Sequence, residues 1–402
     1  MLNSCDTAFV LICSALVFIM TPGLAFFYGG LVRNKNVLSL MMQNFIAMGM
    51  VTVIWAVIGF SLIFGHDVDG IIGGLDYLLM NNIGINSIYP GTGIPVWTFF
   101  IFQLMFAVIT PGLITGAFVD RFKFSSYLIF MSLWSVLVYS VIAHWIWGGG
   151  ILAKLGAIDF AGGTAVHISA GMAALATAMF IGKRRLGEAQ PHNITYVALG
   201  AGLLWFGWFG FNGGSALSAN FIASIAFVNT TLAASVAMLV WLFISWTQKG
   251  KPSLIGALTG AIAGLVAITP AAGYVTPKAA MIIGIVAGVV CYFAMVFKIK
   301  REWDDALDVW ACHGVGGIVG SILTGVFASP EVNSYTGLVF GGYELFKANL
   351  IATVVAAGYS FGVTYLILFV LSKFMDIRVE KEVEEQGLDF HLHGEQAYNL
   401  DW

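Results

Sequence analysis

Two histidines lie in segments where a histidine is costly. His167 and His313 each stand in a run of about twenty apolar or small residues, which is long enough to cross a bilayer. An ionisable side chain at membrane depth costs free energy unless it faces a partner or a water-filled cavity, so such a residue indicates a functional site. The pair therefore predicts a proton-handling or ligand-binding site inside a membrane protein.

Three uses of the histidines are open from the residues alone: packing, a metal or haem ligand pair, and a pore site. A metal site needs further ligands nearby, and Cys312 points about 100° away from the adjacent His313 on a helix. No metal or other cofactor is therefore expected. A pore site explains both histidines and their opposed placement. The preceding aspartates, Asp159 and Asp308, are expected to cap the helices that follow, and Asp159 is also placed to stabilise an arriving cation.

Aromatic residues gather near the predicted membrane surface and inside helices. The three clusters contain Phe102 and Phe106; Trp145 and Trp147; and Trp205, Trp208 and Phe211 with Ser215. Trp208, Phe211 and Ser215 are spaced so that they share one face of a helix. Aromatic faces and a hydroxyl can bind a small cation. An aromatic belt or ordinary helix packing accounts for the same spacing, so both interpretations stay open here.

The composition indicates the kind of protein that must position these residues. The chain is 59% hydrophobic and only 10% charged, against about 25% charged in soluble domains. Its mean hydropathy is +0.89. The net charge of −3 gives no basic surface for a nucleic-acid partner. The composition therefore predicts a multi-pass protein of the cell membrane whose surroundings are the lipid bilayer.

Eleven apolar stretches of transmembrane length predict an all-α polytopic membrane protein. They lie at about 7–32, 38–64, 95–118, 125–147, 161–182, 194–217, 220–246, 253–271, 279–298, 308–328 and 346–374. Fifteen of the eighteen Lys and Arg residues fall in the odd-numbered loops and the tail, and only Lys154, Lys278 and Lys347 fall in even-numbered loops. The positive-inside rule then places the N-terminus outside and the C-terminus inside.

An odd number of spans suits two five-helix halves of opposite orientation plus one extra helix. The first half is expected at about 7–182, the second at about 194–328 and the eleventh helix at about 346–374. The two histidines would then occupy the same place in each half. Residues 1–375 would form the transmembrane domain and 376–402 a cytoplasmic tail.

At these residues the chain resembles the Amt/Mep/Rh family of ammonium transporters, and specifically its prokaryotic Amt branch. The resemblance is carried, in order along nearly the whole chain, by PGLAFFYGGLVRNKNVLS (22–39), FQLMFAVITPGLITGAFVDR (102–121), AHWIWGGG (143–150), DFAGGTAVHI (159–168), WFGFNGGSA (208–216), AFVNT (226–230), CHGVGG (312–317) and GLDFHLHGEQAY (387–398). Any one string is weak evidence, whereas the ordered set is specific.

The resemblance implies roles for individual residues. It places an outer ammonium-binding position on Phe106, Trp147 and Ser215, with Phe102 and Asp159 as supporting residues. It places a stacked phenyl gate on Phe106 and Phe211, and a pore histidine pair on His167 and His313, supported by Trp208 and Asp308. The family's fold has eleven helices, an inverted repeat and one pore in each subunit of a homotrimer.

The resemblance also implies a function and partners. We expect ammonium to be recruited and deprotonated, and ammonia to pass an apolar pore, with proton transfer as a possible companion step and methylammonium as a second candidate substrate. An ammonium sensor and a neutral gas channel are the alternatives. An enzyme is not expected, because no nucleophile or metal constellation is evident.

The tail resembles the family's regulatory C-terminus, which works with a cytoplasmic PII-type (GlnK-like) signalling protein. Arg184 and Arg185 are expected to pair weakly with the tail glutamates, since exposed ion pairs contribute only about 0–1 kcal/mol each. Firm docking would then depend on contacts around Leu388, Phe390 and Tyr398. The alternative is a loose acidic tail.

Overall fold

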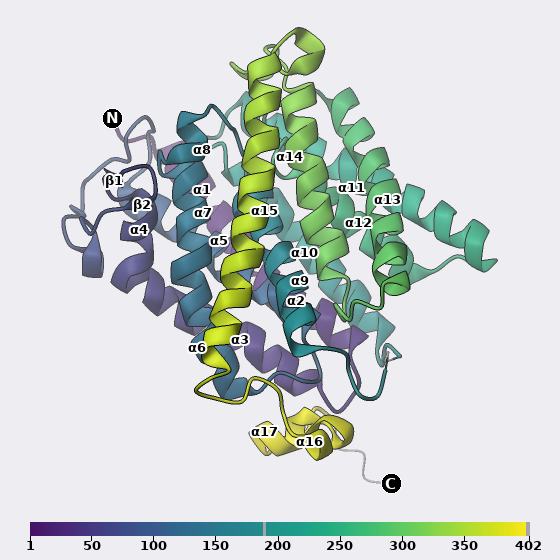
Figure 1. The fold of residues 1–402 in the computed structure, drawn as a ribbon. Helices are drawn as coiled ribbons and strands as arrows, with labels where there is room; N and C mark the ends of the chain where they lie inside the picture. Colours follow the sequence, from purple (N-terminus) through teal and green to yellow (C-terminus); the bar gives the residue numbers. More distant parts are fainter. Residues whose placement is uncertain (188–189, 399–402) are drawn as a thin grey trace.

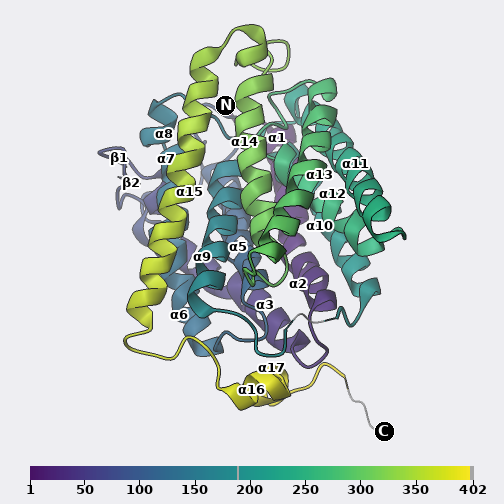
Figure 2. The same ribbon diagram turned by 45° about the vertical axis from the view of Figure 1, so that its right-hand side comes forward.

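The computed structural model describes residues 1–187 and 190–398, which form a bundle of helices running between two ends of the molecule (Figure 1). The amino terminus and the tail lie at opposite ends in both views (Figures 1 and 2), and we name these the N-terminal end and the tail end. Up to residue 187 the helices are α1 (Ser4–Phe18), α2 (Met20–Leu31), α3 (Val37–Ile54), α4 (Phe60–Phe64), α5 (Val96–Ile114), α6 (Phe124–Trp134), α7 (Ser140–Trp147), α8 (Ile151–Lys154) and α9 (Ser169–Ile181).

The remaining helices are α10 (Ile194–Gly214), α11 (Phe221–Lys249), α12 (Leu254–Ile268), α13 (Pro277–Lys300), α14 (Gly316–Phe327), α15 (Tyr343–Leu371), α16 (Lys381–Gln386) and α17 (Leu388–His393). A short antiparallel hairpin, β1 (Asp67–Val68) and β2 (Ile72–Gly73), follows α4.

Within the described ranges, ten helical spans are long and apolar enough to cross a membrane, and the chain is a multi-pass membrane protein. Each of the ten lies at a predicted stretch. The predicted span at 253–271 corresponds to α12, which is apolar but has only 15 residues. At 1.5 Å per residue it is about 22 Å long, less than the roughly 30 Å of a hydrocarbon core. The count of eleven spans therefore stays a prediction.

Polar side chains fix where several helices begin. A side-chain oxygen just before the helix accepts a hydrogen bond from a backbone N–H of its first turn, which otherwise has no partner. The residues that do so are Asn3 for α1, Asn193 for α10, Asn220 for α11, Ser253 for α12 and Thr276 for α13. Local sequence therefore determines these helix starts.

The two helices that carry the histidines cross through glycines. Each begins with a π-helical turn, Gly163–Ile168 ahead of α9 and Trp310–Val315 ahead of α14. A Cβ atom on Gly171 would lie 2.0 Å from the backbone nitrogen of Gly314. A Cβ on Gly317 would lie 2.9 Å from the carbonyl oxygen of Gly163. Small residues thus let the two backbones touch, as in other membrane bundles, and bring the histidines face to face.

The tail forms two short helices that lie across the tail end (Figures 1 and 2). The Asp389 carboxylate accepts hydrogen bonds from the backbone N–H groups of Leu38 and Ser39, at 3.0 and 2.8 Å, in the first turn of α3. The Asn36 side chain accepts one from the N–H of Leu388, a buried residue. These contacts show that the described part of the tail is packed, so the loose-tail alternative is wrong for residues 376–398.

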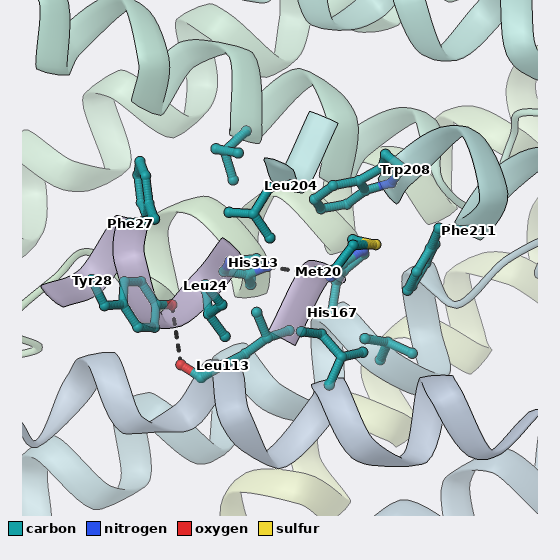
Figure 3. A pocket seen from close by; sticks show the side chains of 13 residues that line it. Met20, Leu24, Phe27, Tyr28, Leu113, His167, Leu204, Trp208, Phe211 and His313 are labelled. Atoms are coloured by element: carbon teal, nitrogen blue, oxygen red, sulfur yellow. Dashed lines mark hydrogen bonds between the residues drawn. The ribbon is translucent and has the colours of Figure 1, made fainter. Parts of the chain in front are cut away.

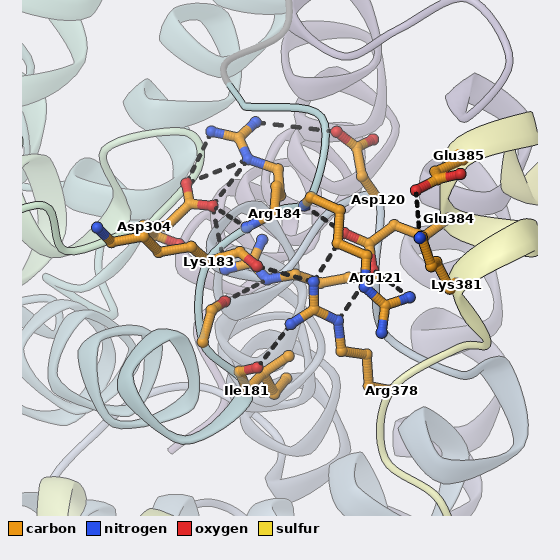
Figure 4. A network of polar contacts seen from close by, with 12 residues as sticks. Asp120, Arg121, Ile181, Lys183, Arg184, Asp304, Arg378, Lys381, Glu384 and Glu385 are labelled. Atoms are coloured by element: carbon orange, nitrogen blue, oxygen red, sulfur yellow. Dashed lines mark hydrogen bonds and ion pairs between the residues drawn. The ribbon is translucent and has the colours of Figure 1, made fainter.

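The ion pairs around the tail (Figure 4) include one that was expected, in which the Arg185 guanidinium lies 3.7 Å from the Glu384 carboxylate. Glu384 is 1% exposed, accepts two hydrogen bonds from the Arg378 guanidinium at 2.8 and 2.9 Å, and accepts one from the backbone N–H of Arg185. The Arg184 guanidinium bonds to Asp304. The prediction of weak exposed pairs was wrong for Glu384, because the fold buries this carboxylate beneath a loop.

Of the two aromatic residues expected to dock the tail, one contacts the body of the protein and the other is exposed. Tyr398 lies with its hydroxyl 2.9 Å from the Nε2 atom of His192, so it contacts the body of the protein. Phe390 is 61% exposed and therefore adds little apolar contact, contrary to expectation.

The glycine crossing gives a prediction about folding. Gly171→Val should abolish assembly, because its side chain would meet backbone atoms that cannot move aside. The matched control is Gly202→Val, since a Cβ on Gly202 meets nothing within 4 Å. The measurement is the yield of monodisperse protein after detergent extraction. Equal yields for both variants would contradict the crossing.

Candidate functional site

The three residues predicted for an outer site line one cavity. Phe106 of α5, Trp147 of α7 and Ser215 at the end of α10 surround a space of about 210 Å³ together with Asp159. We name it the aromatic cavity. Its other lining residues are Phe64, Tyr89, Phe99, Gln103, Phe160, Leu217 and Tyr274. Residues from four separate parts of the sequence thus meet as expected.

The contacts of these side chains leave their faces available. The Trp147 indole N–H donates to the backbone carbonyl of Asp159 at 2.9 Å, and its ring meets Phe106 edge-on at 5.8 Å. The Ser215 hydroxyl donates to the carbonyl of Phe211 at 2.9 Å. A hydroxyl that donates its proton keeps lone pairs with which to accept a hydrogen bond from a cation. The cavity therefore offers aromatic faces and one directed acceptor.

Seven lining residues of the aromatic cavity were missed from the sequence, and Gln103 and Tyr274 show two different reasons. Gln103 precedes Phe106 by three residues, so helical spacing could have placed both on one face. Tyr274 follows α12 in a turn that carries no signal of its position, and only the fold brings its ring to Phe160, at 5.3 Å.

Asp159 caps the helix that carries His167, as predicted. Its two carboxylate oxygens accept hydrogen bonds of 2.7–3.1 Å from the backbone N–H groups of Gly162, Gly163, Thr164 and Ala165. The residue is 5% exposed. An acceptor here satisfies N–H groups that begin a helix inside the protein and have no partner within that helix.

A pair of phenyl rings closes the aromatic cavity on its deeper side. The rings of Phe106 and Phe211 lie 4.4 Å apart at 40°. Both side chains are almost fully buried. Phe102 lines no part of the aromatic cavity and packs behind Phe106 at 5.0 Å, where Gly214 leaves room for its ring. The predicted gate residues therefore meet, and Phe102 supports one of them from behind.

The two histidines meet close to Phe211, one ring of the phenyl pair (Figure 3). The Nδ1 atoms of His167 and His313 are 3.2 Å apart. The His167 ring stacks on Trp208 and on Phe211, at 5.5 and 5.9 Å. The Trp208 N–H donates to the hydroxyl of Thr269 at 2.9 Å, which fixes the indole beside the imidazole.

The contact between the histidines restricts their protons. Of two nitrogens at hydrogen-bond distance, one must donate and the other must accept, so the two rings cannot be in the same neutral tautomer. The Nε2 atom of His167 is buried and has no hydrogen-bond partner among the described residues. A buried polar atom without a partner is costly, so this nitrogen is a candidate for contact with a substrate.

The space around the histidines is narrow and apolar. Its other lining residues are Met20, Leu24, Phe27, Tyr28, Ile109, Leu113, Val166, Leu204, Trp208, Phe211 and Ile262. The Tyr28 hydroxyl, its main polar group apart from the imidazoles, donates to the carbonyl of Leu113. The free volume is about 10 Å³, which is room for about one water molecule. We name it the histidine cavity.

A third cavity, of about 150 Å³, continues from His313 towards the tail end and includes Asp308. The expectation that Asp308 caps the helix of His313 was wrong. Asp305 accepts the hydrogen bond from the backbone N–H of Trp310 at 2.7 Å, whereas Asp308 pairs with Lys298 at 2.5 Å. The reason is the backbone: Asp308 adopts φ 59° and turns its side chain away from the helix start.

A polar cluster borders α7 close to Trp147. His144 of α7 lies with Nδ1 2.7 Å from the carbonyl of Ile63 and Nε2 2.9 Å from Asp67. Hydrogen bonds from Lys154 and His144 lower the pKa of the Asp67 carboxyl to about 2. Both ring nitrogens of His144 at the helix end are thus hydrogen-bonded.

Three cavities in line through a multi-pass bundle, the middle one apolar apart from paired imidazoles, define a membrane channel or transporter. The family model described as Ammonium Transporter Family matches residues 8–398. The chain belongs to this family.

Relatives and solved structures agree with the assignment. The chain is 48% identical to ammonium transporter Amt1 of Archaeoglobus fulgidus, over 98% of this chain and 99% of the relative. It superposes on Candida albicans Mep2 with a TM-score of 0.89 and 38% identity, covering 95% of this chain and 87% of that one. A structure described as a sensor Amt protein matches with a TM-score of 0.90 and 30% identity, covering 96% and 98%.

Proposed function

We propose that this protein transports ammonium by binding the cation in the aromatic cavity, removing its proton and conducting ammonia through the histidine cavity. The observation that carries the proposal is the order of the cavities. A space built from aromatic faces and a hydroxyl is followed by a phenyl pair, and then by a space whose polar atoms are chiefly those of the imidazoles.

Free energies favour deprotonation before passage. Moving an intact ion into an apolar interior costs roughly 20 kcal/mol in an idealised calculation, and several in practice. An amine titrates near about pH 10, so removing its proton at pH 7 costs roughly 4 kcal/mol. Ammonia is neutral and small enough for the histidine cavity. Potassium cannot lose a proton, so the same apolar space excludes it.

The histidine pair would offer hydrogen bonds to ammonia inside the apolar space. The unpartnered Nε2 atom of His167 is the nearest such group to the phenyl pair. Two imidazoles in contact cannot both be charged near neutrality, so they would titrate as one coupled pair. A proton shared by this pair could cross with each ammonia, and current measured beside uptake decides whether it does.

Topology and assembly form part of the proposal. The positions of the basic residues support an outer N-terminus and an inner tail, and two π-helical starts that each carry a histidine support an inverted repeat of 7–182 and 194–328. Residues 1–375 would be the transmembrane domain and 376–402 a regulatory tail, of which 399–402 lie outside the described residues. The homotrimer is proposed from the family resemblance.

A neutral gas channel and an ammonium sensor are the two alternative functions, and each differs from ammonium transport in one testable feature. A neutral gas channel needs no cation site, so the aromatic cavity with Asp159 on its wall argues against it. A sensor is suggested by the structural similarity to a sensor Amt protein, and it would bind ammonium without rapid transport. The test is ammonium-evoked current and uptake in liposomes that contain the purified protein. Saturable uptake supports transport, whereas binding without uptake supports a sensor.

The outer site gives the second prediction. Trp147→Leu should weaken a cation–π contact by roughly 0.5–2 kcal/mol, which raises the half-saturation concentration for ammonium a few-fold to about thirtyfold. Trp246→Leu is the matched control, because Trp246 is 45% exposed on α11 and does not line the cavity. Unchanged half-saturation in folded Trp147→Leu would remove this residue from the site.

The third prediction concerns the paired imidazoles. His167→Ala combined with His313→Ala should lower the transport rate or the selectivity for ammonium over potassium, because the histidine cavity loses its hydrogen-bonding rings. His66→Ala, in a loop outside the cavities, is the control. The measurement is uptake and current with each cation. Wild-type rate and selectivity in the double variant would sink the assigned role.

The tail gives the fourth prediction. We propose that its contacts with α3 transmit regulation by a PII-type signalling protein. Asp389→Ala removes the acceptor for two N–H groups of α3 and should reduce uptake or its inhibition by that partner, as should deletion of residues 381–402. Phe390→Ala, next to it and exposed, should change neither. Normal uptake and inhibition in the deleted protein would show that the tail has no regulatory part.

A further inference from the structure

Asn349 joins three parts of the structure that belong to the site. It lies on α15, is 1% exposed and makes three hydrogen bonds through its carboxamide. Its Oδ1 atom accepts from the N–H of Ile158 at 2.9 Å, and its Nδ2 atom donates to the carbonyls of Ile158 at 3.2 Å and Ser321 at 3.0 Å. A carboxamide carries a donor and an acceptor on adjacent atoms, so Asn349 can bond to both the carbonyl and the N–H of Ile158. A carboxylate has no donor, and a hydroxyl has a single oxygen for both roles.

The bonded segments lead directly to the functional residues. Ile158 immediately precedes Asp159, whose carbonyl accepts the Trp147 indole N–H and whose carboxylate caps the turn that carries His167. The position of Ile158 therefore sets the acceptor that orients the Trp147 ring.

Ser321 brings in the other histidine helix. It lies on α14, eight residues after His313, and its hydroxyl is 3.2 Å from that of Thr164 in the turn carrying His167. Helix α15 packs against both α9 and α14 and runs along the outside of the bundle beside α14 (Figure 2). The Asn349 side chain is thus bonded both to the segment that leads into the His167 helix and to α14, which follows the turn that carries His313.

We propose that Asn349 is a positioning residue, which sets the orientation of Trp147 in the aromatic cavity and thereby the affinity for ammonium. It lines none of the three cavities, so it would act through Ile158 and Asp159 and not by touching the substrate. This inference rests on the proposed function. It adds that the helix outside the two expected halves determines the geometry of the cation site.

The variants are Asn349→Leu, which is similar in size but has no polar group, and Asn349→Ser, which cannot make the paired bonds. The matched control is Thr353→Val, one turn further along α15, where the hydroxyl donates within its own helix, to the carbonyl of Asn349. The full chain is tested in liposomes by ammonium uptake, normalised to folded protein. The Asn349 variants should raise the half-saturation concentration about threefold to tenfold, less than full loss of a cation–π contact, while the maximal rate falls less. Thr353→Val should match wild type.

A double variant separates positioning from simple stability. In the Trp147→Leu background, Asn349→Leu should add no further rise in half-saturation, because the ring that it orients is gone. A merely structural role would lower the amount of folded protein and leave half-saturation unchanged, and that result overturns the inference. Additive effects overturn it as well, and so does failure of both Asn349 variants to assemble. If wild type shows no saturable uptake, the proposed function itself has failed. If only Trp147→Leu has no effect, Trp147 is not part of the site and this inference fails while the proposed function stands.

Discussion

The structure depends on one constraint: a helix that begins inside a membrane protein must find partners for its first N–H groups within the protein. Water can satisfy these groups at a surface but not here, where each unpaired group costs several kcal/mol. The helix of His167 meets the constraint through Asp159, which accepts four backbone hydrogen bonds. The helix of His313 does so in part through Asp305.

The start of the His167 helix also borders the aromatic cavity, because Asp159 belongs to both. The Asp159 carboxylate is engaged with backbone N–H groups, and the residue also lines the aromatic cavity. The Asp159 carbonyl orients Trp147 at the same time. One short segment therefore serves both the helix start and the hydrogen bond of an aromatic ring, and Asn349 holds the residue before it at both its N–H and its carbonyl.

Close packing at glycines is the second requirement for the histidine pair. A Cβ at Gly171 would occupy the place of Gly314 backbone, so any larger residue would separate the two helices. The distance of 3.2 Å between the imidazoles, which forces unlike tautomers, follows from this approach. Under the proposed mechanism, selectivity by loss of a proton would require no ring of carbonyl ligands, since apolar walls reject a cation that stays charged.

Sequence alone determined the membrane class, ten of the spans, the family and some of the residues that line the cavities, because hydropathy, caps and ordered motifs are local signals. It also predicted that Asp159 caps a helix. Tertiary structure decided that Asp305 and not Asp308 caps the second histidine helix, that Tyr274 reaches the aromatic cavity and that Glu384 is buried. Each of these depends on backbone direction or on contacts between distant segments. The spacing of residues along the chain encodes neither backbone direction nor contacts between distant segments, so only the folded protein could reveal these three features.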